Sequence, residues 1–134
     1  MRIFSKWLVV LAGLGFLGYG IAFLIAPEAT LAGAGLQLTG IGGNVELRAF
    51  YGGLELGIGL WLIFAGVNNK SPNDKLLRSA LWLTLASNGG IGCSRLLGLA
   101  LGGAWIPFFG YALPWELGFA ALAAGALLFS RGRY

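Results

Sequence analysis

Long apolar runs alternate with shorter, more polar segments along the whole chain. The runs cover residues 7–25, 47–67, 80–101 and 114–130. Each is close to the roughly 20 apolar residues that an α-helix needs to cross about 30 Å of hydrocarbon. The pattern therefore predicts an all-α membrane protein, a bundle of four transmembrane helices that forms a single domain over residues 1–134.

The first run follows a short basic lead at residues 1–6. A secretory signal peptide also has a basic start, but its apolar stretch covers only about 7–15 residues. The run at 7–25 is longer and is followed by a poor cleavage site, which favours a retained span. It contains GLGFLG at 13–18, which matches the dinucleotide pattern G-x-G-x-x-G. No preceding strand supports that reading, so close helix packing is the favoured one.

Proline and glycine mark the boundaries of the runs. Pro27 ends the first, because proline removes a backbone donor and clashes inside a helix. The Gly- and Ala-rich segment 28–44 predicts a loop with a short interfacial helix near residues 30–38. Residues 68–79 form the one clearly hydrophilic connection. Pro114 suits the first turn of the last helix, after an aromatic-rich turn.

The distribution of basic residues predicts the topology. Lysine and arginine collect on the cytoplasmic side of a membrane protein. Here they gather at the two termini and in the second connection, whereas the first and third connections contain neither. The residues concerned are Arg2, Lys6, Lys70, Lys75, Arg78, Arg131 and Arg133. Both termini are therefore expected in the cytoplasm.

Composition excludes several classes of chemistry. The chain is 57% hydrophobic and only 10% charged, whereas soluble domains are about 25% charged. It has no histidine, which excludes His-ligated haem, zinc or copper and a histidine base. Cys93 is the single cysteine, so neither an internal disulfide nor an iron–sulfur cluster can form within one chain. A small packing residue is its favoured role. We expect no metal, no cofactor and no nucleic-acid partner, because topology explains the net charge of +4.

Four charged side chains fall within or beside the apolar runs on the outer side. At 1.5 Å per residue, Glu55 lies about 12 Å and Arg95 roughly 9 Å below the outer boundary. Arg48 lies at that boundary, and Glu116 lies in the first turn of the fourth run. From matched depth and opposite sign, Glu55 is expected to contact Arg95, with Arg48 and Glu116 as a second pair.

Helical spacing adds two polar neighbours to this layer. Arg48 and Glu55 are seven residues apart and share a helix face, with Tyr51 on or near it. Asn88 shares the face of Arg95 in the same way. The candidate ligand-binding or ion-pair cluster is Arg48, Tyr51, Glu55, Asn88, Arg95 and Glu116, without a catalytic assignment. It is either a buried network that fixes helix register or a binding site or ion pathway.

Small residues are frequent, with 24 glycines in the chain. Gly53 and Gly57 form a G-x-x-x-G step, and the third run carries a ladder of small residues, Gly90, Ser94, Gly98 and Gly102. Small residues let helices approach closely in lipid. Packing within the bundle is favoured over homodimerisation.

Three stretches carry a resemblance to a known family. They are APE at 26–28, RAFYGGLE at 48–55 and SR at 94–95. With them the chain resembles a bacterial family of small four-span integral membrane proteins of unknown function, distantly similar to DoxX-like four-helix proteins. The resemblance covers nearly the whole chain. It implies a bacterial inner-membrane location and marks the Arg48–Glu55 face and Arg95 as characteristic positions, but it transfers no activity.

Three functions fit these features. The first is a binding or accessory protein that holds a lipid, a quinone-like molecule or another amphiphile, or that assists a membrane complex. Arg48 and Arg95 would then meet an anionic or carbonyl group. The second is a proton-coupled transporter using Glu55, although an arginine at equal depth would hold that carboxylate charged. The third is a purely structural ion-pair network. An enzyme is least favoured, and the bilayer, an amphiphile, a second copy or a membrane complex are the expected partners.

Overall fold

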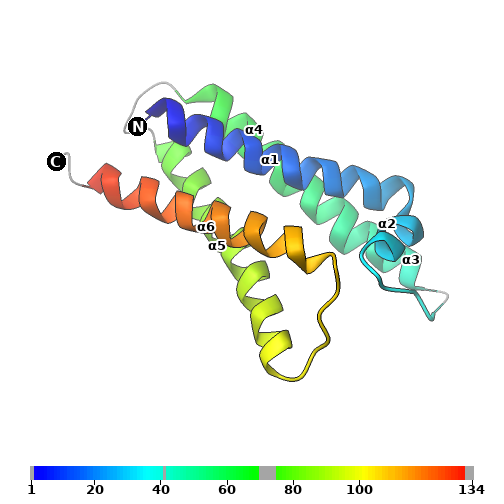
Figure 1. Ribbon diagram of the computed structural model, residues 1–134. Coiled ribbons are helices and arrows are strands. Elements are labelled where there is room, and N and C mark those ends of the chain that lie inside the picture. The colour runs from blue at the N-terminus through cyan, green and yellow to red at the C-terminus, as the bar shows by residue number, and fades with distance from the viewer. Residues whose placement is uncertain (1, 41, 70–74, 132–134) are drawn as a thin grey trace.

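The structure, a computed structural model, describes residues 2–40, 42–69 and 75–131 (Figure 1). Its elements are α1 (Arg2–Ile25), α2 (Pro27–Gly33), α3 (Gly43–Glu46), the π-helical segment η1 (Leu47–Leu54), α4 (Glu55–Asn68), α5 (Lys75–Ala100) and α6 (Phe109–Arg131). No strand occurs in these ranges, which confirms the all-α prediction. Gly43–Asn68 is continuous, so α3, η1 and α4 form one rod.

Within the described ranges, three helices are long and apolar enough to cross a membrane: Arg2–Ile25, Gly43–Asn68 and Phe109–Phe129. Large apolar side chains such as Leu60, Phe64 and Leu128 are exposed on their surfaces. Contiguous exposed apolar surface of this kind is rare on soluble monomers. These features indicate a membrane protein. The fourth rod, α5, has 26 residues, but Asn88, Arg95 and its glycines interrupt its apolar character.

The rods are arranged as two helix pairs. α1 packs along η1 and α4, and α5 packs along α6. The pairs meet where α1 begins and α6 ends, and α5 leans away from α1 and α4 toward its yellow end (Figure 1). The buried core lies at the joined end and consists of Leu8, Val9, Ala12, Phe16, Leu62, Ala65, Leu77, Ala80, Leu81, Ala123, Ala126 and Leu127.

Glycines bring α1 and α4 into backbone contact. Gly52, Gly59 and Gly66 recur every seven residues, and a Cβ on any of them would meet α1, so all three lie on the face of the rod that α1 covers. A Cβ placed on Gly59 would lie only 2.6 Å from the nitrogen of Leu17 and 2.7 Å from the oxygen of Gly13. Gly13 belongs to the GLGFLG stretch, so the structure supports its packing role.

Most of the glycines that are expected to pack against a neighbouring helix face open space instead. A Cβ on Gly57, Gly90 or Gly98 would meet nothing within 4 Å. The packing prediction is therefore wrong for these positions. A small residue in an apolar run does not reveal which way its helix face is turned, whereas the seven-residue repeat of Gly52, Gly59 and Gly66 does.

Two proline positions set the ends of the helices. Ile25 ends α1 as expected, and Pro27 is the first residue of α2, a position that needs no backbone donor. Pro114, in contrast, lies inside α6, which already begins at Phe109. The prediction of Pro114 in the first turn is wrong. The backbone nitrogen of Phe109 already donates to the oxygen of Ile106 at 3.0 Å, so helical turns start ahead of the proline.

The backbone contact predicts a contrast between Gly59→Ala and Gly57→Ala. The first adds a methyl group where backbone already touches backbone, and overpacking of this kind costs about 1–3 kcal/mol. The second adds the same group in open space and removes an entropically costly glycine, so stability should stay equal or rise. Equilibrium unfolding in mixed micelles measures both variants, and equal losses would contradict the glycine contact.

Candidate functional site

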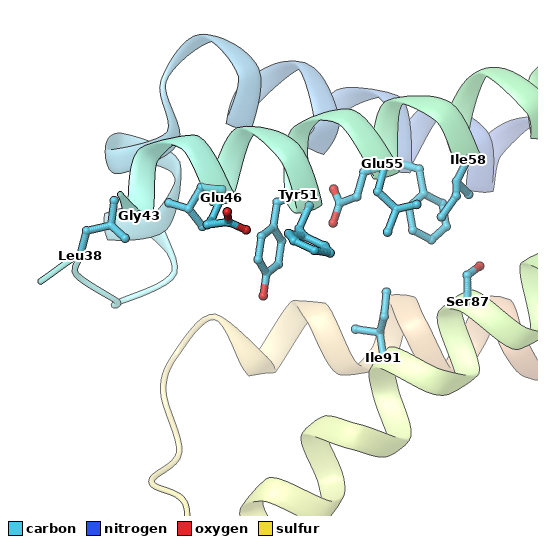
Figure 2. Close-up of a pocket in the computed structure, with 12 residues that line it drawn as sticks. Leu38, Gly43, Glu46, Tyr51, Glu55, Ile58, Ser87 and Ile91 are labelled. Carbon is cyan, nitrogen blue, oxygen red and sulfur yellow. The ribbon is translucent and has the colours of Figure 1, made fainter. Parts of the chain in front are cut away.

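A cleft lies between the two helix pairs. Its volume is about 680 Å³. The Gly43–Asn68 rod forms one wall, and Ser87 and Ile91 of α5 face it from the other side (Figure 2). The lining residues are Phe16, Leu38, Gly43, Glu46, Leu47, Phe50, Tyr51, Leu54, Glu55, Ile58, Ser87 and Ile91. The core at the joined end of the rods closes the cleft on that side.

The cleft is apolar with a few polar groups. Its polar side chains are the carboxylates of Glu46 and Glu55 and the hydroxyls of Tyr51 and Ser87. Among the lining residues that the structure describes, none is a lysine or an arginine. An apolar cavity with few placed polar groups is the usual form of a small-molecule site.

The π-helical segment decides which side chains enter the cleft. In a π-helix the backbone bonds span five residues, so a turn contains more residues than in an α-helix. Side chains along Leu47–Leu54 are therefore rotated relative to the α-helical spacing. Glu55 lines the cleft, whereas Arg48 lies at the surface and donates from Nε to the backbone oxygen of Leu24 at 3.0 Å. The expected shared face of Arg48 and Glu55 is wrong, because it assumed two regular α-helical turns.

Arg95 pairs with Glu116 across the α5–α6 contact. Its Nε lies 2.9 Å from Oε1 and 3.0 Å from Oε2 of the carboxylate. The side chains are 27% and 10% exposed, respectively, so the pair is largely shielded from solvent. The guanidinium carbon also lies 5.1 Å from the ring centre of Phe108 and 5.6 Å from that of Phe109, within cation–π range.

The expected partners are therefore wrong. Within the described residues Arg95 forms its ion pair with Glu116, and neither Glu55–Arg95 nor Arg48–Glu116 is an ion pair. Glu55, Arg95 and Glu116 do lie within electrostatic range of one another. The residue count along each helix did not give the rotation of these side chains about the helix axis, and that rotation decides which of them form a pair.

Glu55 is left without a partner among the described residues. Its Oε2 is buried and accepts no hydrogen bond. Arg95 and Glu116 lie within electrostatic range of it and act on it with opposite signs. The formal charge of the three groups is −1. A buried polar atom without a partner is costly, so a ligand group or a proton at Glu55 would be stabilising.

Of the two remaining residues of the predicted cluster, Tyr51 lines the cleft and Asn88 does not. Asn88 is buried and donates from Nδ2 to the backbone oxygen of Thr84 at 3.1 Å, so its own helix satisfies it outside the cleft. Tyr51 lines the cleft, and its ring centre lies 5.0 Å from that of Phe23. Figure 2 shows Tyr51 and Glu55 projecting from the rod toward α5 and α6.

Sequence reasoning missed several lining residues. Glu46, Phe50, Leu54 and Ile58 recur every four residues along the rod, and this stripe was the available signal. Ile91 and Ser87 lie four and eight residues before Arg95, respectively, and could have been placed on its face by the same count. No cluster of three or more Cys, Asp or Glu that could hold a metal ion occurs in the part of the chain that the structure describes.

Comparison with known families now adds to this geometry. The family profile matches residues 4–127 and so covers both helix pairs. The chain belongs to the DUF4345 family. This family is a domain of unknown function, which confirms the expected kind of family. No curated protein and no solved structure matches the DUF4345 chain. The geometry of the cleft is therefore the basis for assigning a role to this DUF4345 member.

The ion pair predicts a specific pattern of coupling. Arg95→Met or Glu116→Gln alone should lower the free energy of unfolding by up to about 3 kcal/mol, since it leaves a shielded charge unpaired. The double variant should lose less than the sum of the two. Unfolding in mixed micelles measures this cycle, with Arg95→Met and Glu55→Gln as the matched control. A larger coupling energy in the control cycle would contradict the observed pairing.

Proposed function

We propose that this protein crosses the membrane four times, with both termini in the cytoplasm. α5 completes the four spans, since its 26 residues are long enough to cross the membrane and it packs against α6. Its interruptions are tolerated because Glu116 pairs with Arg95 and the backbone of Thr84 satisfies Asn88. Figure 1 supports this topology, because α1 begins and α6 ends at the same end of the molecule. With lysine and arginine at that end, the cleft opens in the outer half of the bilayer.

We further propose that the cleft binds an amphiphile, with its tail against the apolar walls and its head group at Glu55. The single observation that carries this proposal is the unpaired, partly buried Glu55 in an apolar cleft of about 680 Å³. A purely structural network would satisfy its charges internally, as Arg95 and Glu116 do. Glu55 instead faces space that is bounded by Phe16, Ile58 and Ile91, into which a lipid-like chain fits.

The same observation supports proton-coupled transport as a second candidate. The objection to it was an arginine that would hold Glu55 charged. Arg95 is paired with Glu116 instead, so Glu55 is free to exchange a proton for a ligand. Flux of a bound amphiphile that depends on a proton gradient and is abolished by Glu55→Gln would establish this candidate over simple binding.

Filling the cleft tests the binding proposal. Ile91→Trp replaces a branched aliphatic side chain in the cleft with a large indole ring, whereas Leu97→Trp adds the same ring at an exposed position of the same helix. Native mass spectrometry of gently extracted protein should show a bound amphiphile in the wild type and in Leu97→Trp. We expect occupancy to fall at least about tenfold in Ile91→Trp, equivalent to 1.4 kcal/mol. Equal occupancy in all three proteins would refute the proposal.

Cysteine labelling tests the topology. In a Cys93→Ala background, Leu36→Cys and Trp105→Cys place exposed thiols in the first and third connections, and Phe4→Cys places one near the amino terminus. A membrane-impermeant maleimide added to intact cells should label the first two and leave the third unlabelled until lysis. If α5 does not cross the membrane, Trp105→Cys will remain unlabelled and the four-span proposal fails.

A further inference from the structure

We infer that the amphiphile bound in the cleft carries a cationic head group, an amine or quaternary ammonium, which Glu55 receives. This inference rests on the proposed binding function and names its ligand class. It also reverses the expectation from the sequence, in which two arginines would meet an anionic or carbonyl group. The reversal follows from what each charged side chain contacts.

Neither Arg48 nor Arg95 lines the cleft, and each already has a partner elsewhere. Arg95 is engaged by both oxygens of Glu116, and the rings of Phe108 and Phe109 cover its guanidinium. Arg48 donates to the backbone of Leu24 and does not line the cleft. An anionic head group would therefore enter a cleft that contains two carboxylates and no basic lining residue. Its desolvation would go uncompensated.

The carboxylates provide attraction along the length of the cleft. Glu46 is exposed, and Glu55, nine residues further along the same rod, is partly buried. The two positions are less than about 14 Å apart along the axis, which is the distance that nine residues would cover at the α-helical rise of 1.5 Å. Apolar walls with charges of one sign focus the electrostatic field and raise the local concentration of a counter-ion. The exposed carboxylate of Glu46 thus attracts a cation to the cleft, and the cation then pairs with the carboxylate of Glu55, which has no other partner among the described residues.

Aromatic rings lie between the two carboxylates. Phe50 and Tyr51 both line the cleft, and both are about half exposed or more, which leaves their rings accessible. Aromatic faces attract ammonium groups, and recognition of quaternary ammonium ligands uses this interaction. A carboxylate at one end and rings beside it together form a site for a cationic head, whereas the surrounding Leu and Ile side chains take the tail.

The test compares three probes with the same dodecyl chain: dodecyltrimethylammonium, dodecanol and dodecyl sulfate. The protein is held in nanodiscs of an uncharged glycolipid, so that no lipid head group competes for Glu55. Retention of each probe is measured by native mass spectrometry for the wild type, Glu55→Gln, Glu28→Gln and Ile91→Trp. Glu28 is a carboxylate outside the cleft, and thermal unfolding confirms that every variant folds.

The wild type and Glu28→Gln should retain the trimethylammonium probe at least about tenfold better than the sulfate, because the carboxylate of Glu55 and the aromatic faces attract a cation and the carboxylate repels an anion. Glu55→Gln should lose this preference and still retain dodecanol. Binding of all three probes without preference would overturn the cationic head group and leave the binding function standing. Retention in the wild type no better than in Ile91→Trp would overturn the binding function itself.

Discussion

One guanidinium group, that of Arg95, is available in a layer that contains the two carboxylates of Glu55 and Glu116. A charge taken out of water needs a partner, and one arginine forms a close pair with only one of them. The short bonds of Arg95 to both oxygens of Glu116 decide the competition. Glu55 is the group left over. Its position on the wall of an apolar cleft then becomes the main chemical feature of the molecule.

The cleft itself follows from unequal packing of the helix pairs. Gly13 and Gly59 bring α1 against α4 so closely that backbone touches backbone. The α5–α6 pair joins this unit through the core at the end where α1 begins and α6 ends, and further along α1 the ring of Tyr19 contacts that of Phe108 at 6.4 Å between ring centres. Toward the other end α5 leans away from α1 and α4 (Figure 1), and the π-helical segment turns Glu55 into the space between the rod and α5. The close contact of α1 with α4 and the divergence of α5 from them thus produce the cleft in a short chain.

Hydropathy predicted the helical fold because it responds to length and composition, and residues 7–25 or 47–67 satisfy both. Counting residues along the helices also predicted that Glu55, Arg95 and Glu116 lie near one another. It did not predict which of them form an ion pair, because pairing depends on rotation about the helix axis. The π-helical segment Leu47–Leu54 changes that rotation, and the hydropathy pattern does not distinguish a π-helix from an α-helix. Pro114 had the opposite effect: in the sequence it indicates the first turn of a helix, whereas it lies inside α6, whose helical turns begin before it.

The most direct measurement is a crystal structure grown from a lipid mesophase, with the cleft between the helix pairs refined without assumption about its contents. We expect elongated density along Phe16, Ile58 and Ile91 that ends within hydrogen-bond or ion-pair distance of the Glu55 carboxylate. Helix pairs that close on each other, with Glu55 bonded to a protein group and no space left beside Ile91, would contradict a ligand site and establish a structural network instead.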